Sequence, residues 1–182
     1  AIIEVSSFQL ETIHEFHPKI GLILNVVPNH SERYDDVHDY AKAKFQMLKN
    51  MTKEDHLVLG LENPYLDDIK AHPAQKDFFQ KGDLPKDFKQ KFSFKNAKVR
   101  GEHNEANFYA AYKVLELLKI ENLDKLFQDF INEFAGVAHR LEYVLTYNGL
   151  AVYNDAKSTN TLATTTAIKA FNESAEPLYL IL

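Results

Sequence analysis

The run of apolar residues at positions 20–27 constrains the fold more than any other feature of the sequence. Such a run is typical of a strand that a parallel sheet buries between two layers of helices. Further apolar runs at positions 1–5, 57–60 and 177–182 predict additional strands. Helical patterns lie between these runs, and the alternation predicts an α/β fold with a mainly parallel sheet and flanking helices.

The helices are predicted from apolar spacing and from residues that start a helix. Ser6 and Asp39 are suitable N-caps for the segments that follow them. The Lys- and Phe-rich stretch at 78–94 is instead predicted to form short strands separated by turns. Further helices are predicted at positions 103–118, 126–134 and 162–171, with a short one opened by Asn63 and Pro64.

A β-hairpin is predicted around Asn148 and Gly149, because this pair suits a two-residue type I′ turn and apolar residues flank it. Helices precede the hairpin, so we expect a domain boundary near positions 136–140. Predicted strands at both ends of the chain favour a fragment of a longer protein, with a complete small protein as the alternative. The two predicted domains are residues 1–137 and 138–182.

The composition excludes several classes of protein. Hydrophobic residues make up 45% of the chain and charged residues 26%, which is typical of a globular protein. The net charge of −5 argues against a nucleic-acid binder, and no apolar run approaches the ~20 residues that span a bilayer. The absence of cysteine excludes a thiolate metal site and fits a reducing cytoplasm. We expect a cytoplasmic monomer without nucleic-acid or membrane partners.

Polar residues at the ends of two predicted strands are the first candidates for a site. Glu4 lies at the end of the first strand, and His30 follows the run at 20–27. In open α/β sheets ligands bind beyond the carboxyl ends of strands, so both residues should lie at one edge. A metal ion would suit Glu4, although helix capping explains it equally well and most lone histidines are structural. The spacing of Lys44 in the next helix does not select it.

The second half of the chain adds two candidate groups. Asn104 and Asn107 lie one helical turn apart and suit the edge of a nucleobase, although N-capping by Asn104 is an alternative. Arg140 suits a phosphate, although a salt bridge to Glu142 is a competing interpretation. The polar loop at 154–160 lies between a strand and a helix, where a site is expected, and capping of the helix could also explain it.

Taken in order, these segments resemble the Mur ligase family of peptidoglycan synthesis. Any one stretch is a weak signal, but six in the family's order span nearly the whole chain and are specific. The stretches are Glu4-Val5-Ser6-Ser7-Phe8-Gln9-Leu10-Glu11; Leu24-Asn25-Val26 with His30 and Arg33-Tyr34; Ala43-Lys44; His103-Asn104 with Asn107; His139-Arg140-Leu141-Glu142; and Asn154-Asp155-Ala156-Lys157-Ser158-Thr159-Asn160.

The resemblance implies an ATP-dependent ligase, and the first and last stretches favour the member that adds D-glutamate to UDP-N-acetylmuramoyl-L-alanine through an acyl phosphate. It implies that residues 1–137 are most of a central ATPase domain and that residues 138–182 begin a C-terminal, amino-acid-binding, Rossmann-like domain. No glycine-rich phosphate loop is present in the sequence. We therefore expect a full-length enzyme to be active and these residues alone to be inactive.

The resemblance also implies roles for the candidate residues. Glu4, His30 and Lys44 resemble ligands of Mg²⁺, and Lys44 resembles a lysine that carries carbon dioxide as a carbamate. Lys44, His30 and Lys157 are the expected catalytic residues. The expected substrate contacts are Asn104 and Asn107 to adenine, Arg140 to phosphate, Asp155 to ribose, Lys157 and Thr159 to the acyl phosphate and amino acid, and Ser6 to the nucleotide sugar.

Three positions depart from the family's pattern. Asn29 replaces a usual aspartate, which weakens any acidic role there, Ala138 replaces a proline, and Ala156 replaces a serine. Two kinds of rival interpretation remain open. One is a sister enzyme, either another Mur ligase or a ligase like folylpolyglutamate synthase, and the other is an inactive nucleotide-binding domain.

Overall fold

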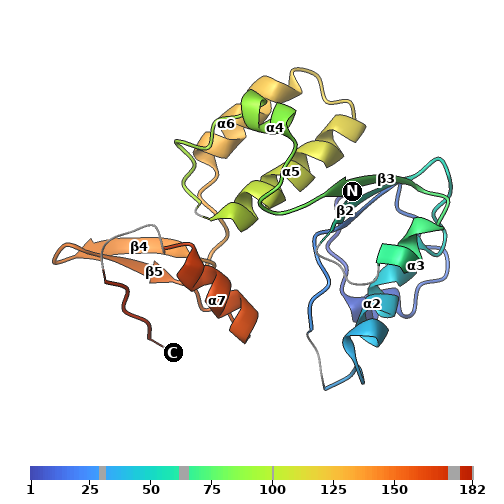
Figure 1. The fold of residues 1–182 in the computed structure, drawn as a ribbon, viewed down its shortest axis with the longest axis horizontal. Helices are drawn as coiled ribbons and strands as arrows, with labels where there is room; N and C mark the ends of the chain where they lie inside the picture. Colours follow the sequence, from blue (N-terminus) through green and yellow to red (C-terminus); the bar gives the residue numbers. More distant parts are fainter. Residues whose placement is uncertain (29–31, 62–65, 100, 172–176, 182) are drawn as a thin grey trace. The chain divides into compact units, whose positions relative to one another are not determined.

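A computed structural model describes residues 1–28, 32–61, 66–99, 101–171 and 177–181, which form two compact units (Figure 1). The first unit comprises Ala1–Pro85 and Tyr109–Ile120, and the second comprises Lys86–Phe108 and Glu121–Leu182. Helix α5, Glu102–Leu117, has residues in both. The predicted division into residues 1–137 and 138–182 is a different one and stays a prediction.

A three-stranded parallel sheet lies at the centre of the first unit (Figure 1). Its strands are β1 (Ile20–Ile23), β2 (His56–Gly60) and β3 (Gln75–Phe79), in the order β1-β2-β3. Leu57, Val58 and Leu59 of β2 are 0% exposed, as expected for a central strand covered on both faces. The predicted α/β fold with a parallel sheet is confirmed.

β1 differs from the strand that residues 20–27 predict. It ends at Ile23, and the side chains of Leu22 and Leu24 are 39% and 40% exposed. Among the described strands β1 pairs with β2 alone, so it lies at an edge of the sheet. The interpretation of a strand buried on both faces therefore applies to β2 and is wrong for β1.

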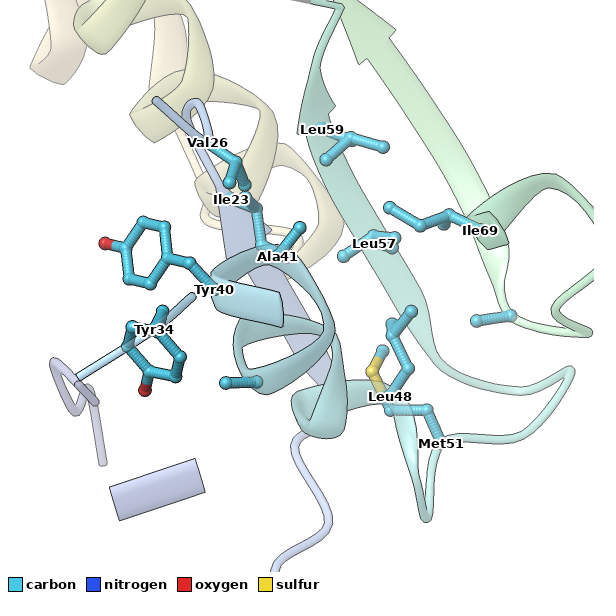
Figure 2. Close-up of a cluster of buried hydrophobic side chains, with 12 residues drawn as sticks. Ile23, Val26, Tyr34, Tyr40, Ala41, Leu48, Met51, Leu57, Leu59 and Ile69 are labelled. Carbon is cyan, nitrogen blue, oxygen red and sulfur yellow. The ribbon is translucent and has the colours of Figure 1, made fainter. Parts of the chain in front are cut away.

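Helix α2 (Val37–Phe45) packs against the sheet through Ala41, and its Tyr40 ring lies beside that of Tyr34 (Figure 2). Its Ala41 is 0% exposed and lies in one buried cluster with Ile23 of β1 and Leu57 of β2. Asp36 caps this helix by accepting a hydrogen bond from the Asp39 N–H at 2.9 Å. The prediction of Asp39 as the cap is wrong, because Asp39 already lies in the first turn.

The described residues of the first unit also form three short helices besides α2 and part of α5. Ser6 caps α1, so that prediction is confirmed. The short helix expected at Asn63 and Pro64 begins on residues outside the described part of the chain. The three helices are α1 (Ser7–Leu10), η1 (Gln46–Leu48) and α3 (Leu66–Lys70).

Gly60 ends β2 at a close approach between two parts of the backbone. A Cβ added there would lie 1.9 Å from the carbonyl oxygen of Leu24, which no side chain can tolerate. Glycine is required because it has no Cβ. The carboxyl end of β2 is therefore held against the segment that leaves β1.

The helices of the second unit pack through phenylalanine rings. Residues 78–94 do not form short strands as predicted, because β3 ends at Phe79 and a helix, α4 (Lys86–Lys91), follows. Phe88 and Phe92 are four residues apart, so both point to one side, and the Phe92 ring lies 5.3 Å from that of Phe127 in α6 (Leu123–Glu133). The other rings of the cluster belong to Phe94, Phe108, Phe130 and Phe134.

A β-hairpin follows, with strands β4 (Glu142–Tyr147) and β5 (Leu150–Asn154). Asn148 and Gly149 have φ angles of 48° and 84°, as a type I′ turn requires. Helix α7 (Thr161–Lys169) comes next and is capped by the Asn160 side chain. The predicted hairpin and helix are both confirmed.

The strands expected at the two ends are not formed. Residues 1–5 and 177–181 pair with no strand in the described part of the chain, and Ile2 and Ile181 are each 95% exposed. An apolar run becomes a strand only when a neighbour supplies its backbone hydrogen bonds. Among the described residues, no helix has both the length and the apolar character to span a bilayer.

Candidate functional site

The first candidate segment begins at Glu4 and continues into α1. Ser6 and Gln9 form a capping box, in which the Gln9 N–H donates to Ser6 Oγ at 3.3 Å and the Ser6 N–H donates to Gln9 Oε1 at 2.9 Å. The Ser6 hydroxyl also donates to Gln9 Oε1 at 3.0 Å. Ser6 thus has a local structural role, and a contact with substrate stays a prediction.

The structure describes two of the three predicted metal ligands, Glu4 and Lys44. Glu4 is exposed, and its carboxylate has no hydrogen-bond or ion-pair partner among the described residues, so its oxygens are free to bind a cation. His30 and Asn29 lie outside the described residues. Apart from those, no three His, Asp or Glu side chains of the described chain form a metal-binding group.

Lys44 lies in the last turn of α2, half-buried, with its Nζ 5.0 Å from the centroid of the Tyr40 ring. An ammonium at this distance is attracted by the face of the ring. It offers only hydrogen-bond donors, so Lys44 could bind a metal only after its amine had become a carbamate. That modification stays a prediction.

A cluster that the sequence did not reveal joins α1 to the segment before α2. The Glu11 carboxylate accepts hydrogen bonds from Tyr34 Oη at 2.6 Å and from Arg33 Nε at 3.4 Å, and it forms an ion pair with Arg33 Nη2. The Phe8 ring stacks on that of Tyr34, with centroids 6.1 Å apart, and Arg33 Cζ lies 5.3 Å from the Phe8 centroid. We refer to Phe8, Glu11, Arg33 and Tyr34 as the Glu11 cluster.

The charges in this cluster hold each other in place. The hydrogen bonds from Arg33 and then Tyr34 lower the pKa of Glu11, so its carboxylate stays ionised. Burial, and then the contact with Glu11, raises the pKa of Tyr34, so its hydroxyl stays a donor. Glu11 and Arg33 are 22 positions apart, and no local pattern links them.

Asn104 and Asn107 lie on the first two turns of α5. The helix begins at Glu102, so Asn104 is inside the first turn and the N-capping alternative is wrong. The Asn104 amide hydrogen-bonds to His103, with Nδ2 and Nε2 3.2 Å apart, while Asn107 is exposed. Three positions separate the two amides, so both lie on one side of the helix.

In the second unit the structure brings together residues 137–142 and the loop after β5. The Leu141 N–H donates to Asp155 Oδ1 at 2.9 Å, and the Lys157 N–H donates to the His139 carbonyl at 3.0 Å. The amide of Asn154 lies 2.9 Å from His139 Nδ1. Arg140 is therefore held beside the loop that carries Asp155 and Lys157, although the two segments are separate in the sequence.

In these two segments, some polar side chains already form hydrogen bonds within the protein and others are exposed. Asp155 also accepts a hydrogen bond from the Ser158 hydroxyl, so its carboxylate already organises the loop. Glu142 accepts the His139 N–H at 2.7 Å and forms no ion pair with Arg140, so the competing salt bridge is absent. The side chains of Arg140, Lys157 and Thr159 are all exposed.

The chain is similar to known proteins along most of its length. The model of the Mur ligase middle domain matches residues 1–115. The UDP-N-acetylmuramoylalanine–D-glutamate ligase of Streptococcus sanguinis is 35% identical over 95% of the chain, and that of Aquifex aeolicus is 36% identical over 96%. The chain spans 41% and 43% of the length of these two relatives.

The fold is also found in solved structures. The crystal structure of MurF from Acinetobacter baumannii matches with a TM-score of 0.65 at 13% identity, over 87% of this chain and 38% of that one. At this identity the likeness concerns the fold alone. Because the domain model covers well over half of the sequence, the chain belongs to the Mur ligase family.

Proposed function

We propose that a protein carrying this segment, with the rest of the length that its relatives have, is an ATP-dependent ligase of peptidoglycan synthesis that adds D-glutamate to UDP-N-acetylmuramoyl-L-alanine. One observation carries the proposal. The eight relatives compared are 34–36% identical over 93–99% of the chain, and each bears the name of that ligase.

The proposed reaction first makes the L-alanine carboxylate electrophilic. A carboxylate oxygen attacks the γ-phosphorus of ATP, ADP leaves, and an acyl phosphate forms. The D-glutamate amine then attacks the carbonyl carbon and loses a proton, and phosphate leaves with the former carboxylate oxygen. Arg140 and Lys157 are exposed cations on adjacent segments, where they would stabilise the negative charge of these steps.

Magnesium, when bound, would supply positive charge to the crowded phosphate oxygens. Glu4 fits this ion because its carboxylate has no partner in the described chain and carboxylate oxygen is the donor that Mg²⁺ prefers. His30 would be a second ligand. Lys44 would join them as a carbamate.

The ATP contacts would come from α5 and the loop pair. Asn104 and Asn107 offer amide donors and acceptors on one side of the helix, which suits adenine. Arg140 would bind a phosphate through its planar guanidinium. Asp155 would bind the ribose with the lone pairs that Leu141 and Ser158 leave unused.

The other substrates would be bound by Ser6 on the nucleotide-sugar side and by Lys157 and Thr159 on the amino-acid side. The oxygen lone pair of Ser6 and the exposed side chains of Lys157 and Thr159 leave room for such contacts. We also propose a cytoplasmic monomer, because ATP and the nucleotide sugar are cytoplasmic metabolites and one chain carries all the proposed contacts.

Substrate selectivity tests this proposal. The whole protein is incubated with ATP, Mg²⁺ and UDP-N-acetylmuramoyl-L-alanine, with either D-glutamate or L-lysine, and phosphate release is measured. We expect release with D-glutamate and background release with L-lysine. The reverse preference would indicate a sister ligase, and background release with both would indicate an inactive nucleotide-binding protein.

A further inference from the structure

Two tyrosine side chains, Tyr34 and Tyr40, connect Glu11 to Lys44. Tyr34 donates its hydroxyl to Glu11 at 2.6 Å, and its ring centroid lies 5.3 Å from that of Tyr40. Tyr40 in turn carries the Lys44 ammonium over its ring at 5.0 Å. Figure 2 shows the Tyr34 and Tyr40 rings beside each other next to α2.

In this series of contacts the two tyrosines are buried, whereas the Glu11–Arg33 ion pair is partly exposed. Tyr34 and Tyr40 are 8% and 7% exposed, so packing fixes their rings. Glu11 and Arg33 are 26% and 53% exposed at the side chain, so their ion pair meets solvent. The buried Tyr34 hydroxyl needs its acceptor, because an unpaired buried donor carries a desolvation penalty.

We propose that Glu11 is a positioning residue for Lys44, acting through Tyr34 and Tyr40. Its carboxylate fixes the orientation of the Tyr34 ring, and the Tyr34 ring fixes the orientation of the Tyr40 ring. The Tyr40 ring then holds the Lys44 amine in one position. The inference rests on the proposed function only in giving Lys44 a place in the ligase site.

Arg33 also restrains the Glu11 carboxylate. Arg33 contacts both oxygens of the Glu11 carboxylate and lies over the Phe8 ring. The carboxylate therefore cannot rotate away from Tyr34 without losing its contacts with Arg33. Replacing Glu11 by glutamine keeps the shape but places an amide donor against the Arg33 donors. The substitution therefore weakens the contacts with Arg33 without leaving a cavity in the Glu11 cluster.

The test is the chemical reactivity of Lys44. The chain is labelled with limiting acetic anhydride in bicarbonate-free buffer, and mass spectrometry gives the rate at Lys44 relative to Lys53, an exposed lysine of the same unit with no side-chain partner in the described chain. We expect Glu11→Gln and Tyr34→Phe to raise the relative rate at Lys44 about two- to tenfold, the lower part of the range found for residues in contact. Glu15→Gln, the same change at an exposed carboxylate with no partner among the described residues, should leave it unchanged.

Two results would overturn the proposal. One is an unchanged relative rate at Lys44 in both variants. The other is an equal rise in the labelling rate of all lysines in Glu11→Gln, together with an unchanged rate at Lys44 in Tyr34→Phe. That result would mean that Glu11 contributes only to general stability.

Kinetics of the whole protein provide a second readout. A positioning role predicts a lower kcat in Glu11→Gln with unchanged KM for ATP and D-glutamate, whereas a rise in KM with unchanged kcat would contradict it. If the wild-type protein shows no ligase activity, the proposed function fails while the labelling result still decides the role of Glu11.

Discussion

Replacing Asp55 by alanine is expected to lower the free energy of unfolding by about 3 kcal/mol, because it removes a buried carboxylate that several donors share. Asp55 is 0% exposed. It accepts hydrogen bonds from the Thr52 N–H at 2.7 Å and from the Thr52 hydroxyl at 2.9 Å, and it contacts His17 at 2.7 Å and Lys19 at 3.2 Å. Without it the Thr52 N–H and hydroxyl both lose their acceptor.

Its place in the sheet explains the size of the effect. Asp55 directly precedes β2, and Lys19 directly precedes β1. The backbone carbonyl of Asp55 also accepts the N–H of Gln75, the first residue of β3. One residue therefore links the amino ends of all three parallel strands.

The effect depends on pH in a defined direction. The hydrogen bond from His17, followed by those from Thr52 and Lys19, holds the pKa of Asp55 far below its ordinary value of 3.8. A carboxyl with a lowered pKa adds stability that is fully present above its unfolded pKa and is lost as the pH falls toward its folded pKa. The difference between wild type and variant should thus be constant above about pH 5 and shrink below pH 4.

Urea unfolding followed by circular dichroism measures this difference. Asp35→Ala is the matched control, since Asp35 is an exposed aspartate of the same unit with no partner in the described chain, and it should change stability by less than about 0.5 kcal/mol. Equal stability of the two variants at pH 7 would contradict a structural role for the buried carboxylate.

Replacing Arg140 by alanine is expected to lower kcat of the whole protein about 100- to 1,000-fold, the usual effect of removing one preorganised donor from a developing charge. The guanidinium is exposed and free of ion pairs within the described chain, so the change should leave the fold intact. Steady-state kinetics with D-glutamate provide the measurement.

Two variants control for charge alone. Arg140→Lys keeps the cation but loses the planar fork, so an intermediate loss is expected. Lys125→Ala removes an exposed cation of α6 that has no side-chain partner among the described residues, and it should have no effect. Activity of Arg140→Ala close to that of wild type would remove Arg140 from the proposed site.

The sequence predicted those features whose cause is local. Asn148 and Gly149 both adopt positive φ angles, so the hairpin could be predicted from this pair. Ser6 and Gln9 form a reciprocal cap within one turn, and the cap was equally predictable. The burial of β2 could be predicted from its apolar residues alone.

Features that depend on distant partners were not predicted. Residues 1–5 have the composition of a strand but pair with no described strand, and α4 forms because Phe88 and Phe92 pack on the neighbouring helices. Asp55 and His17 are 38 positions apart, and no pattern in the sequence joins them. Family resemblance, and not spacing, singled out Lys44, because a modified lysine and a solvated one have the same helical pattern.

The most direct test of the proposed ligase follows an oxygen atom through the reaction. UDP-N-acetylmuramoyl-L-alanine carrying oxygen-18 in the L-alanine carboxylate is incubated with the whole protein, ATP, Mg²⁺ and D-glutamate, and the released phosphate is analysed by mass spectrometry. An acyl phosphate predicts one labelled oxygen in each phosphate, because the carboxylate oxygen leaves with it. Amide formation with unlabelled phosphate would contradict this mechanism, and the absence of amide would contradict the proposed function itself.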